Sequence, residues 1–270
     1  MENLRIFFLF LKNIVQNSYM VKTMVVRDLH SRYSGSLLGI FWSVIHPLAQ
    51  VVTFTFIYTY AFDARLPANE GTTVFAVWFM CGLLPWLMFA DTVKRSSNIL
   101  IANKNLITKN VFPSEILPAV VLFSNIVNHF IFFGIVMFLI LITGGKVSIF
   151  ILLLPFYLLV LSVFALGVGW IVASVDVFLR DVNQILTVVI QLWFFFTPIM
   201  YPASILPPEI QTILKINPLY HVIDGYRRAL LTHEWPDVSE VGYLVVVSLV
   251  IIGLGGIVFR RLKPDFADVL

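Results

Sequence analysis

Six stretches without a charged residue alternate with short polar segments along the chain. They cover residues 33–62, 71–90, 116–145, 147–175, 182–208 and 241–259. A helix needs about 20 mostly apolar residues to cross a bilayer, so at least five stretches are long enough, while 71–90 and 241–259 barely reach that length. Each charge in the middle of the membrane costs about 2.5–3.5 kcal/mol on insertion scales. The pattern therefore predicts an all-α integral membrane protein with six spans.

The composition agrees with a single membrane domain. Hydrophobic residues make up 59% of the chain and charged residues only 12%, against about 25% charged in typical soluble domains. The segments between the stretches are too short for a separate globular domain. We therefore divide one domain, residues 1–270, into an interface region at 1–33, a six-span bundle at 34–260 and a tail at 261–270. The one cysteine, Cys81, lies within 71–90, so no intrachain disulfide is possible.

The orientation follows from the basic residues. With both termini in the cytoplasm, thirteen basic side chains fall on the inner side and five on the outer side. The inner ones are Arg5, Lys12, Lys22, Arg27, Arg32, Lys94, Arg95, Lys104, Lys109, Arg180, Arg260, Arg261 and Lys263; the outer ones are Arg65, Lys146, Lys215, Arg227 and Arg228. Short loops rich in Lys and Arg stay in the cytoplasm. The net charge of +3 therefore reflects topology, and it does not favour a nucleic-acid partner.

Two amphipathic segments precede the first stretch. In residues 4–15 the apolar positions follow helical spacing, which is typical of a helix lying on a membrane surface. The second segment, 19–33, carries several charges and leads straight into the first stretch. Such helices either only anchor a terminus or also dock a partner, and the pattern does not decide between the two.

Uncharged polar residues form stripes in two of the stretches. In the first stretch they are Ser36, Gly39, Ser43, His46, Gln50 and Thr53, and in the fifth they are Gln184, Thr187 and Gln191. Steps of three or four residues place each set on one helical face. Small and polar residues also serve as contacts between membrane helices, and Gly35 and Gly39 have the spacing for close packing. Taken together, the two stripes favour a pore or a seam between subunits.

Aromatic residues are concentrated in one run of the fifth stretch. The chain has 25 Phe, 9 Tyr and 6 Trp, and residues 193–196 are Trp-Phe-Phe-Phe. Most aromatic side chains of membrane proteins face lipid or the interface. Consecutive helical residues point about 100° apart, so we expect one or two of this run to face inward. Our hypothesis is that these rings stack weakly on the sugars of a polymer.

The segment before the third stretch and the segment after the fifth stretch have distinct patterns. In residues 94–115, which the charge count places inside, Ile99, Ala102, Leu106 and Lys109 share a helical face, and Pro113 ends any helix. After the fifth stretch, four prolines interrupt regular structure before two short helix candidates at 209–216 and 219–231. The first pattern predicts a short lever against the membrane, and the second predicts either a gate or a hairpin that seals the outer surface.

Four motifs together resemble the permease subunit of ABC exporters for cell-surface polysaccharides, of the ABC-2 type. They are Arg27-Asp28-Leu29 with Arg32-Tyr33, Ser36, Gly39, Trp42 and Pro47; Asn103 with Asn105-Leu106-Ile107, Lys109, Phe112-Pro113 and Pro118; Phe178 with Arg180-Asp181 and Thr197-Pro198-Ile199; and Asn217-Pro218-Leu219-Tyr220 with Tyr226-Arg227. Their order spans nearly the whole chain. One departure is Ser34-Gly35, where many relatives carry basic residues.

The resemblance implies how the work is divided in the exporter. Two permease copies would join two ABC ATPase subunits, and ATP with Mg would bind to those partners, because this chain lacks a phosphate-binding loop: Gly144-Gly145-Lys146 has neither the first glycine nor the hydroxyl residue. We therefore expect no enzyme activity, no bound cofactor, no catalytic residue and no metal site in this chain. The expected substrate is a lipid-linked polysaccharide, most simply O antigen, exported across the bacterial inner membrane. Capsule or teichoic acid, a small lipid or a drug, and a scaffold without transport are the alternatives.

Three groups of residues carry the expected roles. The substrate channel is assigned to Trp42, His46, Gln50, Thr53, Gln184, Thr187, Gln191, Trp193, Phe194 and Phe195. The resemblance implies that ATPase coupling falls to Arg27, Asp28, Arg32, Tyr33, Asn103, Asn105, Leu106, Lys109, Phe112 and Pro113. It implies an outer gate at Pro198, Tyr201, Asn217, Pro218, Tyr220, Tyr226 and Arg227, although surface ion pairs are the favoured role of Arg227 and Arg228.

Overall fold

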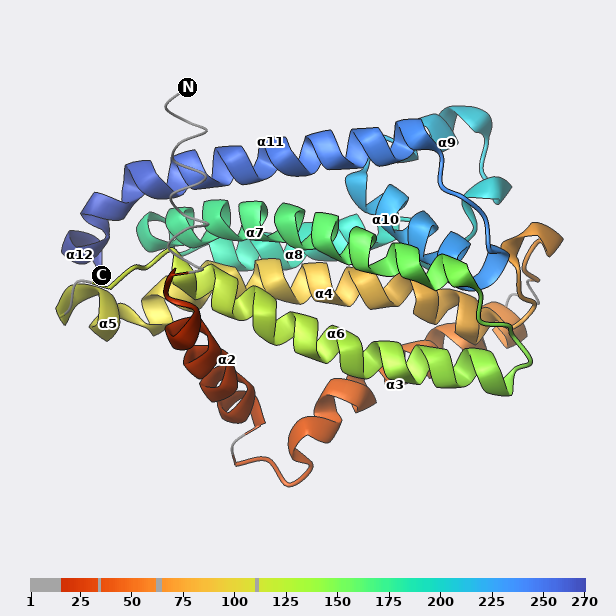
Figure 1. Ribbon diagram of the computed structural model, residues 1–270, viewed down its shortest axis with the longest axis horizontal. Coiled ribbons are helices and arrows are strands. Elements are labelled where there is room, and N and C mark those ends of the chain that lie inside the picture. Colours follow the sequence, from red (N-terminus) through yellow and green to blue (C-terminus); the bar gives the residue numbers. More distant parts are fainter. Residues whose placement is uncertain (1–15, 34, 62–64, 110–111) are drawn as a thin grey trace.

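The computed structural model describes residues 16–33, 35–61, 65–109 and 112–270, and in these residues every regular element is a helix. Figure 1 shows the apolar helices of the bundle running roughly along the long axis of the molecule. They are α3 (Trp42–Phe56), α4 (Phe75–Ala102), α6 (Ile116–Ile142), α7 (Leu154–Phe178), α8 (Val182–Phe196) and α11 (Val238–Leu262). The all-α membrane class predicted from the sequence is confirmed.

Helix α4 forms the centre of the bundle. It packs against α7 and α6 most extensively, then against α10 (Pro218–Arg227), and to a smaller extent against α8 and α3. In its most apolar 18-residue window 78% of the residues are buried, against 28–39% in α6, α7 and α11. Helices α7 and α11 approach each other so closely that a Cβ atom on Gly255 would collide with the backbone of Gly167. Small residues allow this approach, which membrane helices use in place of hydrophobic attraction.

The lengths of the helices correct one expectation from the sequence. Five helical segments of the described chain are long and apolar enough to span a membrane: Trp42–Ala61, Phe75–Ala102, Ile116–Ile142, Ile149–Phe178 and Val238–Val269. The stretches at 71–90 and 241–259 thus belong to long helices, because α4 and α11 continue into charged residues that reach the interface. The stretch that falls short of a full span is 182–208, because its helix α8 has 15 residues and is only about 22 Å long.

The first stretch is not one continuous helix. The helix α2 (Ser18–Tyr33) ends before Gly35, and the chain turns at Gly35 and Gly39, which have φ angles of 80° and 51°, before α3 begins at Trp42. Positive φ angles favour glycine, and nothing lies within 4 Å of a Cβ built on either residue. These glycines therefore serve a turn, and the expectation of close helix packing was wrong. The predicted helix at 4–15 lies outside the described residues.

Short helices mark the two ends of the bundle. At one end, called the α5 end, α5 (Lys104–Lys109) contacts the C-terminal α12 (Phe266–Val269). At the opposite end, called the α10 end, lie α9 (Pro208–Leu214) and α10 (Pro218–Arg227), as Figure 1 shows. The helices expected at 209–216 and 219–231 are thereby confirmed. The single helical face expected from Ile99 to Lys109 was wrong, because the backbone breaks at Asn103 between α4 and α5.

Candidate transport and coupling site

Two helices of the bundle leave one side uncovered. Within the described residues, α8 has no buried side chain, and only Pro47 and Val51 are buried in α3. The two helices flank α4 and meet through Phe54 and Phe194, whose ring centroids lie 6.1 Å apart. Since every other spanning helix has a buried core face, α3 and α8 form the incomplete side of the bundle.

The polar side of α3 lines a cavity of 1090 Å³. Trp42, His46, Gln50 and Thr53 border it from α3, and Asn125 and Asn128 border it from α6. Of the expected stripe, Ser36 lies outside the helix, where its hydroxyl accepts a hydrogen bond from the indole of Trp42 at 3.0 Å. The cavity therefore contains all four channel residues that the sequence placed in the first stretch.

The polar residues of α8 do not reach this cavity. Gln184 and Gln191 are exposed, and the hydroxyl of half-buried Thr187 donates to the backbone carbonyl of Asn183 at 3.0 Å. The structure thus does not bring the two stripes together inside one protomer. A shared passage requires a second molecule on the uncovered side.

The aromatic run divides between the core and the surface. Trp193 packs edge-on against Phe89 with centroids 5.2 Å apart, and its indole donates to the side-chain oxygen of Asn217 at 3.0 Å. Phe194 contacts the ring of Trp86 at 5.6 Å. Phe195 keeps 49% of its surface exposed. Of the three channel residues in this run, only Phe195 is exposed.

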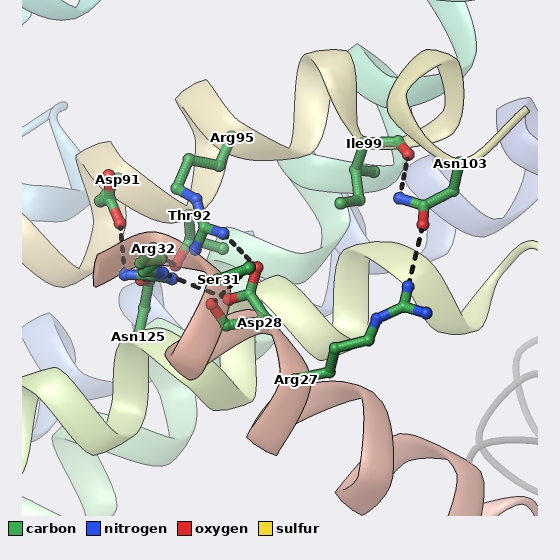
Figure 2. Close-up of polar contacts among 10 residues, drawn as sticks. All are labelled: Arg27, Asp28, Ser31, Arg32, Asp91, Thr92, Arg95, Ile99, Asn103 and Asn125. Atoms are coloured by element: carbon green, nitrogen blue, oxygen red, sulfur yellow. Dashed lines mark hydrogen bonds and ion pairs between the residues drawn. The ribbon is translucent and has the colours of Figure 1, made fainter. Parts of the chain in front are cut away.

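A charged network joins α2 to α4 and α6 at the α5 end (Figure 2). Asp28 accepts hydrogen bonds from Arg95 at 2.5 Å and from Arg32 at 3.2 Å. Arg32 also lies 3.4 Å from Asp91 and donates to the Asn125 oxygen at 2.6 Å. This set, called the α2–α4 network, is partly buried, so its charges are less screened than those of surface pairs.

Two buried residues, Asn125 and Thr92, hold the α2–α4 network in place. The amide nitrogen of Asn125 donates to the Thr92 hydroxyl at 3.0 Å, and that hydroxyl donates to the Met88 carbonyl at 2.6 Å. Because the amide nitrogen is occupied, the amide oxygen of Asn125 is oriented toward Arg32. A buried amide thus fixes the position of a charged side chain on α2.

The coupling residues surround the break between α4 and α5. The amide of Asn103 donates to the Ile99 carbonyl at 2.9 Å and accepts a hydrogen bond from Arg27 at 3.4 Å. Leu106 is half-buried, while Asn105 is exposed. Phe112 packs against the main core, and Pro113 is half-buried. The side chains of Tyr33 and Lys109 lie outside the described part of the structure.

The C-terminal segment closes the same end, a contact that the sequence analysis missed. Lys263 lies 2.6 Å from Glu115, a carboxylate that is only 1% exposed at the start of α6. Phe266 is fully buried and touches Phe259 and Phe178, with centroids 5.4 and 6.2 Å apart. A lone acid directly before an apolar stretch was the available signal, because such a group needs a cation when it is buried.

Arg227 is buried inside the α10 end. Its two terminal nitrogens donate to the carbonyls of Pro198 and Ile199 at 2.7 and 2.9 Å, and its guanidinium lies 3.4 Å from the centroid of Trp78. These carbonyls follow the end of α8, where backbone acceptors have no helical partner. An Arg227 at the outer surface was therefore a wrong expectation: this side chain substitutes for the missing backbone donors.

The neighbouring Arg228 forms the expected ion pairs. It lies 2.6 Å from Asp224 and 3.5 Å from Glu240. Burial raises the pKa of the Asp224 carboxyl above its ordinary value, and the positive charge of Arg228 opposes that rise. The surface pairing predicted for this arginine is confirmed.

Asn217 joins α8 to α10. Its side-chain oxygen accepts from the backbone nitrogen of Leu219 at 3.1 Å and from Trp193, and its nitrogen donates to the Thr197 hydroxyl at 2.8 Å. Pro218 follows as the first residue of α10, a position that tolerates the missing N–H group. One side chain thus caps α10 and holds it against the end of α8.

The tyrosines of the α10 end have separate contacts. The Tyr226 hydroxyl lies 3.2 Å from the ring nitrogen Nε2 of His129 on α6. The Tyr201 hydroxyl donates to the Phe195 carbonyl at 3.0 Å, and Tyr220 is half-buried beside His221. The expected gate residues therefore form one packed region, in which side chains fasten irregular backbone to the spanning helices.

The match to known proteins covers most of this architecture. A family model described as ABC-2 type transporter matches residues 19–231, from α2 through α10. The chain belongs to the ABC-2 type transporter family. The matched region includes the uncovered helices, the α2–α4 network and the α10 end, and it ends before α11 and the Lys263 contact.

Relatives of this ABC-2 family member are similar over nearly their whole length. The O-antigen export system permease protein RfbA of Myxococcus xanthus is 27% identical, over 95% of this chain and 97% of that protein. A protein of the same name from Klebsiella pneumoniae is 28% identical, over 90% and 92%. The polysialic acid transport protein KpsM of Escherichia coli is 25% identical, over 89% and 92%.

Proposed function

We propose that the chain is the channel-forming subunit of an ATP-driven exporter that moves lipid-linked polysaccharide, most simply O antigen, across the bacterial inner membrane. The observation that carries the proposal is the full-length similarity to permeases named for O-antigen export. The complex would contain two copies of the chain and two ABC ATPase subunits, which bind ATP and Mg. The α5 end would face the cytoplasm, and so would both chain termini.

The uncovered side of the bundle supports a channel shared by two copies. Helices α3 and α8 expose their polar residues, and one protomer does not join the two stripes. Two copies meeting along these helices would bury the exposed apolar positions Phe195, Val52 and Val188 near the passage. The glutamines, His46 and Thr53 would then offer neutral hydrogen-bonding groups to sugar hydroxyls, with Phe195 as a stacking surface.

The α5 end supports a coupling role. Helix α5 contacts α12, and the α2–α4 network ties α2 to two spanning helices. A force applied by an ATPase to α2 or α5 therefore has direct contacts through which it can reach α4. This arrangement fits a subunit that is driven by a separate ATP-hydrolysing protein.

Reconstitution tests the proposal. The permease and its partner ATPase are placed together in proteoliposomes, and ATP-dependent movement of lipid-linked polysaccharide is measured. We expect Leu106→Asp and Phe112→Ala to retain ATP hydrolysis but lose most export, because the contact between α5 and the spans is disrupted, while Leu179→Ala, an exposed position, exports normally. Export by the permease alone, or normal export by both variants, would contradict the proposal. Export of capsular polymer in preference to O antigen would reassign the substrate.

A further inference from the structure

A second cavity lies at the α5 end, beside the α2–α4 network. Its volume is 820 Å³. Helix α2 contributes Arg27 and Asp28 to its lining, α4 contributes Asp91, Lys94 and Arg95, and amides come from Asn98, Asn103 and Asn183. This cavity, called the basic pocket, shares Asp91 and Arg95 with the 1090 Å³ cavity along α3. A group bound there would lie directly beside that cavity.

The charges that face the basic pocket favour an anion. Three cations and two carboxylates line it, and Arg32 adds a fourth cation from the shared boundary. Among the described residues, Lys94 forms no ion pair, and Arg27 bonds only to the neutral amide of Asn103. The positive charge therefore exceeds what the two carboxylates neutralise. The first turn of α8, which brings Asn183, adds the partial positive charge of a helix N-terminus.

Arg95 carries a donor without a partner beside the basic pocket. One terminal nitrogen, Nη2, donates to Asp28 at 2.5 Å, while the other, Nη1, is buried without a hydrogen-bond partner within the described structure. A buried charged donor without a partner is costly. Guanidinium groups bind phosphate oxygens through paired N–H donors, so Arg95, which lines the pocket, has the chemistry to hold a phosphate there.

The position along α4 indicates the source of the anion. Asp91, Lys94 and Arg95 directly follow the uncharged residues 71–90, which form the apolar part of the helix. The end of an apolar span lies at the level of the lipid headgroups. An anion at this depth is most simply the phosphate of an amphiphile in the membrane.

We propose that the basic pocket binds the phosphate or diphosphate group of a lipid, with Arg95 and Lys94 as its main contacts. This inference rests on the proposed function in one respect, because the lipid that we assign to the pocket is the anchor of the exported polysaccharide. The phosphate would be held at the α5 end while the attached sugars lie next to the cavity along α3. The same chemistry occurs in bulk anionic phospholipid, and the experiment separates the two sources.

Binding is measured on the purified full-length permease in a phosphate-free detergent. The probes are farnesyl diphosphate, farnesol and short-chain phosphatidylglycerol. We expect farnesyl diphosphate to bind and farnesol not to bind. Arg95→Gln and Lys94→Gln are each expected to weaken binding about tenfold, the usual value of one charge-assisted hydrogen bond. The matched control is Arg260→Gln, which removes an exposed cation from the same end of the bundle and is expected to leave binding unchanged.

Lys94→Gln keeps the test decisive if Arg95→Gln does not fold, because Lys94 is exposed and forms no ion pair within the described residues. Tighter binding of phosphatidylglycerol than of farnesyl diphosphate, with the same sensitivity to Lys94, would support the phosphate site and assign it to membrane phospholipid. Equal binding of farnesyl diphosphate and farnesol, or insensitivity to Lys94→Gln and Arg95→Gln, would overturn the proposal.

Export assays on the same preparations separate this inference from the proposed function. If the wild-type complex exports polymer but binds none of the phosphate probes, the lipid-phosphate site is wrong and the proposed exporter function stands. If the complex binds the probes but exports no polymer, the proposed exporter function is wrong and the lipid-phosphate site stands.

Discussion

The two ends of the bundle are fastened by different kinds of contact. At the α5 end, side chains on separate elements pair with one another: Asp28 with Arg95, Arg32 with Asp91, and Lys263 with Glu115. At the α10 end, Arg227 is hydrogen-bonded to backbone carbonyls, and its guanidinium lies over the ring of Trp78. Ion pairs between partly exposed groups exchange at low cost, whereas a buried backbone acceptor has no alternative partner.

The difference indicates which end moves. A helix that is held by exchangeable pairs can shift relative to its neighbours and form new pairs. An end whose irregular backbone depends on hydrogen bonds from side chains such as Arg227 and Asn217 has no such alternative partners. We therefore expect substitutions at the α10 end to reduce stability and substitutions at the α5 end to reduce coupling.

The largest effect is expected from Arg227→Met. Two buried carbonyls, those of Pro198 and Ile199, would lose their donors, which should cost about 3 kcal/mol. Thermal unfolding in detergent, followed by tryptophan fluorescence, measures this loss. The adjacent Arg228→Met is the control, because its ion pairs are partly exposed and contribute about 1 kcal/mol or less. Equal losses from the two variants would contradict the assigned role of Arg227.

Asn217→Ala is expected to have the next largest effect. The substitution removes the cap of α10 and the contacts to Trp193 and Thr197, at a cost of about 2 kcal/mol. The fluorescence of Trp193 should also shift, because its indole loses an acceptor. Asn98→Ala, at an exposed position of α4, should change neither quantity. An unchanged unfolding temperature for Asn217→Ala would show that α10 is held by packing alone.

A smaller loss is expected from Lys263→Gln. Glu115 would lose the cation that faces it, but Lys263 is 37% exposed, so solvent screening limits the cost to about 1 kcal/mol. The ATPase activity of the assembled complex should change more than its unfolding temperature, because α12 lies against α5. Arg261→Gln, an exposed neighbour, serves as the control. A stability loss as large as that of Arg227→Met would contradict the expectation that substitutions at the α5 end affect stability less than substitutions at the α10 end.

The smallest stability change is expected from Asp28→Asn. The side chain of asparagine keeps an oxygen that can accept the hydrogen bonds from Arg32 and Arg95, so only the charge is lost, at a cost of about 1 kcal/mol. Export per ATP hydrolysed should nevertheless fall several-fold, because α2 loses its ion pair to α4. Asp268→Asn changes the same charge at an exposed position of α12 and should export normally. If export per ATP hydrolysed is unchanged in Asp28→Asn, the α2–α4 network has no role in coupling ATP hydrolysis to export.

The sequence predicted the elements well because each depends on local pattern. Uncharged stretches identified the spans, and prolines identified the irregular segment before α10. Contacts between distant residues were not readable in the same way. Arg227 was counted as an outer cation because nothing local shows that the carbonyls of Pro198 and Ile199 lack donors. Likewise, the pairing of Glu115 with Lys263 joins residues far apart in the sequence.

The candidate channel was predictable only in part. Helical spacing correctly placed His46, Gln50 and Thr53 on one side of α3, where they line a common cavity. The same reasoning grouped Trp193 with Phe195, although Trp193 packs inward against its own protomer. Periodicity gives the relative directions of side chains on a helix, but which direction is the core depends on the neighbours of that helix.

Cysteine cross-linking tests most directly whether two copies meet along α3 and α8. The only native cysteine, Cys81, is fully buried, so single cysteines can be introduced at exposed positions: Thr53→Cys on α3, Phe195→Cys on α8, and the control positions Phe138→Cys on α6 and Val246→Cys on α11. Oxidation in native membranes should produce disulfide-linked dimers through Thr53→Cys and Phe195→Cys and none through the controls. Dimers formed only through the control positions would contradict the shared channel.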